Sequence, residues 1–447
     1  MKKWLVVFNC FCALFSVFAE EISWTGADAT NPYLWSSPAN WSTGAVPTEN
    51  DDVFVFDANL ITNNTLTAVH NLVIKNSKIV LAKKGITSRW SINGKLELKE
   101  GSVITCALST YKVTNPTIYP INITVNGADG IYIDSTSQIT TSALGFEKNG
   151  KGSPSNGYVG AAYGGMGGHL LNYGVATLWT NSDCYGDIRQ PGDLGSAGIW
   201  AKAESGGLIT LFAPNGNITL DGVLSSDGRV KGYTGPGSGG SVLVSAKNLL
   251  GSGTVSALGG DYVSGAEAGG SGRIAIYQTE GAKWNEAIKL RCYPFHTNEN
   301  RISSGPGTIY IENAGDNGEG ELIVDSNNFI SRDTFTDMNG VLKDLVPYLA
   351  CRIANNVTGI DVPFKKLTIK NKARFTVVPG KTIYIRKLDA TTAAAIRANI
   401  YIGNGPEDPR KTEVTSLYDT DVCSASGGTS YGDIYILKKY GFSVRVR

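Results

Sequence analysis

The sequence predicts an all-β protein: a right-handed parallel β-helix whose N-terminal end is closed by an aromatic-rich cap. Three observations lead to this prediction. A strand phrase returns at nearly constant spacing, the composition is rich in glycine and poor in charge, and tryptophans cluster ahead of the repeats. The chain has 447 residues, of which 54 are glycine and 18% are charged; an average soluble protein carries less glycine and more charge.

The repeated phrase is five residues long, begins with glycine and occurs four times. The copies start at Gly207, Gly240, Gly272 and Gly307, which are 33, 32 and 35 residues apart. In each copy the third and fifth residues are aliphatic and the others are mixed, which is the period of a strand with one buried face. Because one coil cannot bury such a row but stacked coils can, the fixed period indicates a solenoid rather than a sandwich of β-hairpins.

A second strand is expected after each copy, at residues 222–226, 253–257, 287–290 and 320–324. Each repeat therefore has the order strand, turn, strand, loop. Outside the repeats, the phrase at 72–76 returns in similar form at 367–371, and an alternating strand follows both. The same kind of coil is therefore expected on both sides of the glycine-rich middle.

The chain divides into four expected parts: a signal peptide at 1–19, a tryptophan-rich cap at 20–58, the β-helix at 59–315, and a β-rich continuation of the solenoid at 316–447. The β-helix contains a glycine-rich insertion at about 146–206 without periodicity. A stretch of that kind is more often functional, or an ordered excursion, than a plain loop. Residues 390–397 are alanine-rich and form the single helix candidate, and 441–447 are expected to form the last strand.

The first residues have the features of an export signal. Lys2 and Lys3 precede an apolar stretch from 4 to 18, and Ala19 ends a small-residue cleavage site. An uncleaved anchor is the alternative. No later segment is apolar enough to cross a bilayer, and the formal net charge of +1, with acids and bases interspersed, does not favour nucleic acid. The sequence therefore predicts a secreted or cell-surface protein, expected to be a monomer.

The cap holds three tryptophans, Trp24, Trp35 and Trp41. The first coil of a solenoid has no neighbour beneath it, so aromatic side chains are expected to cover its apolar end. The alternative is a sugar-stacking surface, because flat carbohydrate faces suit indole rings. Exposed and coplanar tryptophans would indicate this second role.

The cysteines do not form a redox or metal motif. Beyond the leader, which contains Cys10 and Cys12, the chain has Cys106, Cys184, Cys292, Cys351 and Cys423, and no two of these are close in sequence. We expect most of them to be small buried fillers. One disulfide between distant coils is the alternative.

Three parts of the sequence resemble a known group of proteins. They are the opening Trp24-x-Gly, Asn40-Trp41, Asp-x-Val pattern, the Gly-Gly-His and Tyr-Gly middle, and the phrase at 251–260 followed by that at 269–277. Together they resemble the glycine-rich, pectin-lyase-like β-helix proteins exported by bacteria, which are mostly uncharacterised and adhesin-like. The resemblance implies the fold and export. It supplies no catalytic motif that can be transferred.

Enzymes with this fold that act on acidic polysaccharides use calcium-binding acids and a basic proton acceptor on one exposed face. Five charged residues lie in or beside successive repeats: Asp227, Arg229, Lys231, Asp261 and Arg273. Asp227 and Asp261 could share a calcium ion if they came within about 5 Å. Aligning the repeats instead places Leu258 opposite Asp227, so the acids do not form a ladder. No catalytic or metal-binding residue is assigned, and calcium remains an alternative only.

Other motifs favour ordinary structure. Residues 316–321 have the oxygen density of a calcium loop but not the spacing of an EF-hand, so a plain turn is expected. Residues 235–240 satisfy Gly-x-Gly-x-x-Gly, but a strand follows where a nucleotide site needs a helix. The histidines His70, His169 and His296 are scattered, without partners at ligand spacing.

The sequence therefore predicts an exported structural or adhesin-like surface protein that contacts extracellular polysaccharide or cell-surface glycans, with no assignable catalysis. The first alternative is an extracellular polysaccharide lyase or hydrolase, which would need acids and bases that converge in a cleft. The second is a carbohydrate-binding module that uses the cap tryptophans.

Overall fold

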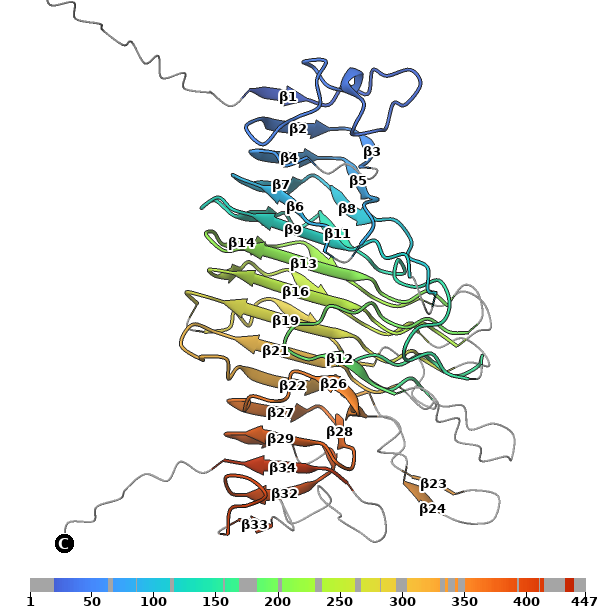
Figure 1. The fold of residues 1–447 in the computed structure, drawn as a ribbon, viewed down its shortest axis with the longest axis vertical. Coiled ribbons are helices and arrows are strands. Elements are labelled where there is room, and N and C mark those ends of the chain that lie inside the picture. Colours follow the sequence, from blue (N-terminus) through green and yellow to red (C-terminus); the bar gives the residue numbers. More distant parts are fainter. Residues whose placement is uncertain are drawn as a thin grey trace, which may run out of the picture.

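The computed structural model describes residues 20–62, 67–85, 87–112, 116–155, 157–168, 183–199, 203–229, 235–261, 267–281, 283–294, 304–329, 334–336, 342–344, 350–391, 394–409, 411–413 and 431–437. The predicted leader, the last strand predicted at 441–447, Lys231, His169, His296 and Cys423 lie outside these ranges. The described strands are stacked along one long axis from the N-terminal to the C-terminal end (Figure 1). The predicted class is confirmed: an all-β parallel β-helix with a tryptophan cluster near its N-terminus.

Three sheets surround the first core. Sheet 1 contains β1 (Glu21–Ser23), β2 (Asp52–Phe56), β4 (Asn71–Lys75), β7 (Leu96–Lys99), β10 (Ile131–Ile133), β14 (Ile218–Leu220) and β17 (Leu249–Leu250). Sheet 2 contains β3 (Asn59–Ile61), β5 (Lys78–Leu81), β8 (Val103–Cys106), β11 (Gln138–Thr140), β15 (Val223–Ser225), β18 (Thr254–Ser256) and β20 (Lys289–Arg291). Sheet 3 contains β6 (Trp90–Ile92), β9 (Ile121–Val125), β13 (Leu208–Ala213), β16 (Ser241–Ala246), β19 (Arg273–Gln278), β21 (Thr308–Glu312), β22 (Glu321–Asp325), β27 (Lys366–Lys370) and β30 (Leu388–Ala390).

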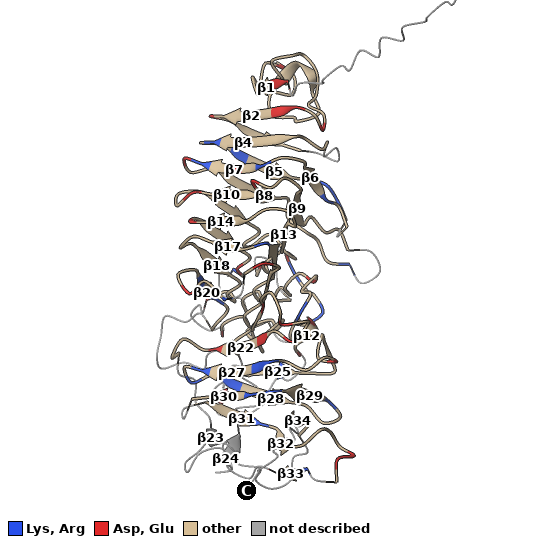
Figure 2. Cartoon of the chain, turned by 90° about the vertical axis from the view of Figure 1, so that its left-hand side faces the viewer, with Lys and Arg blue, Asp and Glu red and all other residues tan. Residues whose placement is uncertain are grey.

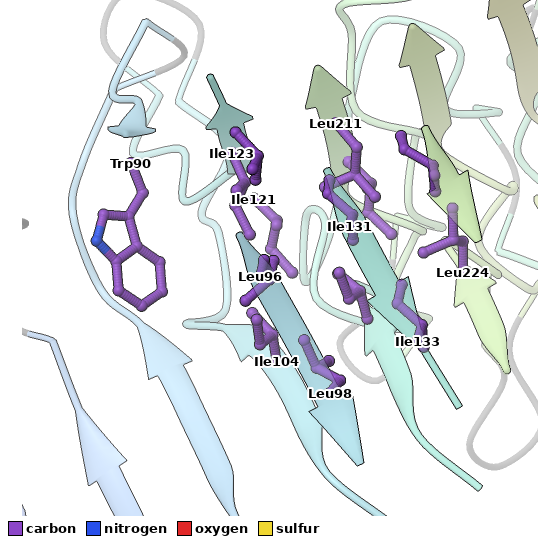
Figure 3. Close-up of a cluster of buried hydrophobic side chains, with 14 of the residues drawn as sticks. Trp90, Leu96, Leu98, Ile104, Ile121, Ile123, Ile131, Ile133, Leu211 and Leu224 are labelled. Carbon is purple, nitrogen blue, oxygen red and sulfur yellow. The ribbon is translucent and has the colours of Figure 1, made fainter. Parts of the chain in front are cut away.

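The predicted repeats are the successive coils of this helix. Their first aliphatic positions are register partners across β13, β16, β19 and β21, as Ile209, Val242, Ile274 and Ile309. All four side chains are buried in one core. The interior is filled by aliphatic side chains that point inward from all three sheets, as Figure 3 shows for an earlier part of the stack.

The glycine that opens each repeat is required by how closely the coils stack. A Cβ atom on Gly240 would lie 2.1 Å from the carbonyl oxygen of Gly207, and one on Gly272 would lie 2.0 Å from that of Gly240. Gly307 repeats the relation with Gly272, again at 2.0 Å. Real Cβ atoms do not approach a carbonyl oxygen this closely, so the repeated glycine is a packing requirement.

The strand predicted at 320–324 forms, but not in the row of second strands. β15, β18 and β20 occupy sheet 2 as expected, whereas β22 pairs antiparallel with β21 in sheet 3, with Leu322 opposite Tyr310. The intervening turn contains Gly315, Asn317 and Gly318 at φ values of 86°, 52° and 85°. These left-handed conformations allow a tight reversal of the chain, which an equal spacing in sequence does not reveal.

After this reversal the core changes sides. Ile309 and Ile311 of β21 face the first core, whereas Tyr310 of the same strand and Leu322 and Val324 of β22 belong to a second core. Sheet 3 therefore has a core on each face, and the later strands build on the opposite face from the earlier ones. Because strand direction and core side reverse together, the sense of winding is preserved.

The second core is completed by shorter sheets. β25 (Cys351–Ile353), β28 (Arg374–Val377) and β31 (Ala395–Arg397) form one, and β29 (Thr382–Ile385), β34 (Asp433–Ile436), β32 (Asn399–Ile402) and β33 (Thr412–Glu413) form another. β23 (Thr334–Thr336) and β24 (Leu342–Asp344) form a separate hairpin. The helix predicted at 390–397 is wrong, because Ala395, Ile396 and Arg397 lie in β31, where the coil-to-coil ladder overrides alanine's helix propensity.

The two Leu-x-Ile-Lys-Asn phrases occupy equivalent corners of the two cores. Each forms a strand, β4 or β27, and then turns at an asparagine, with φ of 42° at Asn76 and 55° at Asn371. Asparagine tolerates this left-handed conformation better than most residues. The predicted similarity of the two coils is confirmed.

The described parts of the glycine-rich insertion, residues 146–155, 157–168, 183–199 and 203–206, pack on the outer face of sheet 3. Its strand β12 (Tyr185–Asp187) pairs parallel with β26 (Asn356–Thr358), beside the second core. Elsewhere its backbone bonds to the glycine-rich corners of the repeats, for example from Gly164 N–H to the Ser271 carbonyl at 3.0 Å. The backbones lie so close that only glycine fits at many positions, and this explains the aperiodic composition.

Candidate functional site

One hollow among the described residues lies where the first core ends and the second begins. We call it the step groove; it has a volume of about 560 Å³. It is lined by Trp284, Glu286, Ile288, Leu290, Ile309, Ile311, Asn313, Glu321, Ile323, Asp325, Lys366, Thr368 and Lys370. These residues come from β20 and the turn before it, β21, β22 and β27.

The groove follows from the change of core side. Sheet 3 continues into β22 and β27, but sheets 1 and 2 of the first core end at β17 and β20. Had the winding continued unchanged, one face of β22 and β27 would have covered the first core. That face instead lies beside the end of the first core, where it forms a wall of the groove. The floor consists of Ile309, Ile311 and neighbouring aliphatic side chains, with Trp284 and Ile323 partly buried against them.

The wall is charged and ion-paired. Lys366 Nζ lies 3.2 Å from Glu321 Oε1 and 2.9 Å from Asp389 Oδ2, and the Thr368 hydroxyl donates to Glu321. Lys370 Nζ lies 3.4 Å from Asp325 Oδ2. Figure 2 shows this alternation, with acidic residues on β22 and basic residues on β27. Each lysine on the wall is therefore already in contact with a carboxylate.

The protonation equilibria of the wall do not suit acid–base chemistry near neutral pH. Partial burial disfavours the charged form of Lys366, but the hydrogen bonds to Asp389 and Glu321 together raise its pKa. The hydrogen bond from Lys366 lowers the pKa of Asp389. A general base needs a lysine with a lowered pKa and a general acid needs a carboxyl group with a raised one. The pKa of Lys366 is raised and that of Asp389 is lowered, which is the reverse of what these two roles need.

Glu321 and Asp389 lie close together, because both contact Lys366 Nζ, at 3.2 and 2.9 Å, and the cation stands between them. The two carboxylates of β22 are spaced unlike a glycosidase pair. Glu321 and Asp325 lie on the same face of β22, four residues apart, which corresponds to about 13 Å in an extended strand. Glycosidases place their two carboxyl groups about 5–9.5 Å apart. The groove therefore brings acids and bases together across neighbouring coils, as the enzyme alternative requires, but holds them as ion pairs.

The described charged residues of the repeats, Asp227, Arg229, Asp261 and Arg273, do not share one open face, and Asp261 is half-buried. Arg273 is fully buried under the insertion, where its Nε and Nη2 donate to the Tyr185 carbonyl at 3.0 and 2.7 Å. Asp227 Oδ1 accepts from the Ser256 hydroxyl and the Leu258 amide, and burial raises the pKa of Asp227. Arg229 is exposed. Asp227 and Arg273 therefore serve as internal hydrogen-bonding groups.

The acidic side chains of the turn at 316–321 also pair with other residues of the chain. Lys365 contacts Asp316 at 2.6 Å, Arg386 binds both oxygens of Glu319 at 2.8 and 2.6 Å, and Glu321 belongs to the groove wall. Among the described residues, no group of three or more His, Cys, Asp or Glu side chains could hold a metal ion. A plain turn, as expected, accounts for the composition.

The cap tryptophans form a buried cluster. Trp35 and Trp41 are 0% and 2% exposed, and their ring planes are inclined by 73°. Trp24 meets Trp41 at 86° and Trp90 meets Trp35 at 88°. These edge-to-face contacts suit a core, and Trp24 is partly buried. The rings are not coplanar, as a sugar platform would require, so the arrangement favours the cap interpretation.

The described cysteines Cys106, Cys184, Cys292 and Cys351 are buried free thiols. Burial raises the pKa of Cys106 and of Cys351 to about 12, so these two thiols do not ionise at neutral pH. His70 Nδ1 lies within hydrogen-bonding distance of Asp52 Oδ1, at 2.7 Å. Burial explains the four cysteines and the contact with Asp52 explains His70, so neither requires a reactive role.

A second hollow, of about 800 Å³, lies where the insertion meets the second core. Its lining is polar, and its charged groups are committed: Lys151 contacts Asp193 at 2.6 Å, and Asp187 accepts from the amides of Arg189 and Gln190. Its one aromatic residue, Tyr185, is buried. Its lining has no aliphatic side chain and no partly exposed aromatic one comparable to Trp284, so the step groove is the better candidate.

The step groove was not predicted from the sequence. Part of its wall belongs to β22, which the sequence places in another sheet, and Trp284 lies in the one repeat whose second strand lacks a glycine. That irregularity was the single signal at the site. Comparison with known proteins adds no further guide: no family model, no curated protein and no solved structure matches the chain. Within the described residues, no helix is long and apolar enough to span a membrane.

Proposed function

We propose that the protein is an exported, adhesin-like β-helix that binds an extracellular glycan in the step groove without cleaving it. The observation that carries the proposal is the composition of the groove: an aliphatic floor with Trp284 beside a wall of ion-paired hydrogen-bonding groups. A pyranose chain has apolar C–H faces and hydroxyl edges. Binding sites that combine apolar lining with a few fixed polar groups are typical for small ligands.

Export rests on the leader at 1–19 and on the resemblance to pectin-lyase-like proteins exported by bacteria. The solenoid supports a surface role, because a stack of coils presents extended faces for binding. The ion-paired wall favours binding over catalysis, since neither Lys366 nor Asp389 has the protonation behaviour that a lyase or hydrolase needs. Among the described residues, we find no feature that supports the enzyme alternative more strongly than the ion-paired wall supports binding.

Replacing Trp284 is the direct test of this site. We expect Trp284→Ala to weaken glycan binding at least about fivefold, if stacking on a sugar face contributes as much as the about 1–3 kcal/mol of aromatic stacking on a nucleic-acid base. Binding would be measured on a glycan array and then by titration calorimetry with the purified full chain.

The matched control is Trp24→Ala, which removes a partly buried tryptophan from the cap, far from the groove along the stack. Its binding should equal that of the wild type once both variants are shown to be folded by circular dichroism. If Trp284→Ala bound the glycan as tightly as the wild type, the step groove would not be the binding site. Binding to no glycan would leave a surface scaffold as the function.

A further inference from the structure

The step groove carries more negative than positive charge. Its lining has three acidic residues, Glu286, Glu321 and Asp325, and two basic ones, Lys366 and Lys370, so its formal charge is −1. Glu286 lies at the exposed rim. A ligand with carboxylate or sulfate groups would therefore approach a site of like charge, which disfavours binding.

The two cations of the wall already lie beside carboxylates. Lys366 is in contact with both Glu321 and Asp389, and Lys370 with Asp325. A uronic acid bound to either lysine would therefore lie close to a carboxylate of the wall. Repulsion between these like charges disfavours an acidic ligand. The groove contains no further Lys or Arg among its described lining residues.

The remaining groups suit uncharged hydroxyls. Carboxylate oxygens accept hydrogen bonds from hydroxyl groups, and Asn313 and Thr368 can both donate and accept. Trp284 and Ile323 are each only partly buried, so they present apolar surface to the C–H face of a sugar ring. We propose that the ligand is a neutral polysaccharide, a chain of hexose units without uronic acid, sulfate or phosphate. This inference rests on the proposed glycan-binding function and names its ligand class.

The inference differs from what the pectin-lyase-like resemblance suggests, since enzymes of that fold on acidic polysaccharides use calcium and free basic groups. It also predicts a weak dependence on salt. A neutral ligand releases no counterions, so its affinity should change less than about twofold between 50 and 500 mM NaCl, whereas a uronate would bind with strong salt dependence.

The test compares neutral and acidic oligosaccharides of equal length on the full chain. Cellohexaose, mannohexaose and laminarihexaose are the neutral probes, and hexagalacturonate and hexaguluronate are the acidic probes, each with and without calcium. We expect at least one neutral probe to bind at least about tenfold more tightly than both acidic probes. Tighter binding of an acidic probe would overturn the inference but leave glycan binding intact. Binding of no probe in either class would overturn both.

A charge-reversal variant tests the electrostatic argument separately. Glu286→Lys changes the formal charge of the lining from −1 to +1 at an exposed position, so it should fold normally. We expect it to strengthen binding of hexagalacturonate relative to the neutral probe at least about fivefold at low salt. The exposed Glu280→Lys, whose residue is not part of the groove lining, is the control. An unchanged preference in Glu286→Lys would contradict the role given to groove charge.

Discussion

Arg273→Ala is expected to lower the free energy of unfolding by about 3–5 kcal/mol and to loosen the glycine-rich insertion. Arg273 is fully buried, donates twice to the Tyr185 carbonyl, and donates from Nη1 to the Thr308 hydroxyl at 2.8 Å. Its guanidinium also lies 5.4 Å from the centre of the Tyr163 ring. Truncation would leave a buried carbonyl without its donors and a cavity between the insertion and sheet 3.

The measurement is chemical denaturation, with limited proteolysis to report on the insertion. Arg229→Ala is the matched control, because Arg229 is an exposed arginine near the same repeats, and surface substitutions usually change stability by less than about 0.5 kcal/mol. Arg273→Ala should also be cleaved first within 146–206. If the two variants had equal stability and the same cleavage pattern, Arg273 would not hold the insertion in place.

Gly272→Ala is expected to have the larger effect and to prevent correct stacking of the coils. The added Cβ would lie 2.0 Å from the Gly240 carbonyl oxygen. Two coils would have to separate to accept it, and they are joined by six register pairs between β16 and β19. We expect a loss of at least about 4 kcal/mol or failure to fold. This exceeds the about 1–3 kcal/mol that is usual for overpacking, because the backbone of a whole coil must move.

Gly192→Ala provides the comparison, because its added Cβ would meet nothing closer than the Gln190 carbonyl oxygen at 3.8 Å. Thermal unfolding and soluble yield would be measured for both. Gly192→Ala should unfold within a few degrees of the wild type. A Gly272→Ala protein that did the same would show that the repeated glycine is not a packing requirement.

The predictable part of the fold is the part that repeats. Ile209, Val242, Ile274 and Ile309 recur because every coil presents the same row to one core, so the sequence period is the structural period. The tryptophan cap was predictable for a related reason, since the end of a solenoid needs cover. Both follow from the burial of apolar surface, which is visible in a sequence as a pattern.

The parts that were missed depend on contacts between distant segments. Strand 320–324 has the composition and spacing of a second strand, but the turn at Gly315, Asn317 and Gly318 sends it back along β21. The alanine-rich segment ending at Arg397 is a strand because its neighbour β28 offers a ladder. Arg273 has the charge of a candidate catalytic base, and only the docked insertion shows that it is a buried structural group.

The step groove could not be predicted because it is created by that one reversal. Trp284, Glu321 and Lys366 are far apart in the sequence, and they meet because the core changes sides between β21 and β22. The sequence can predict coils of uniform winding, but a groove at an interruption of that winding depends on where the interruption falls.

The central claim, binding without cleavage, is tested most directly by following a bound polysaccharide over time. Any glycan that the full chain binds would be incubated with it for a day, with and without calcium, and analysed for new reducing ends and for unsaturated products. We predict neither product above the background of the uncatalysed reaction, because Lys366 stays protonated and Asp389 stays ionised at neutral pH. Either product, lost in Lys366→Met but retained in Glu280→Lys, would contradict this account and identify the groove as an active site.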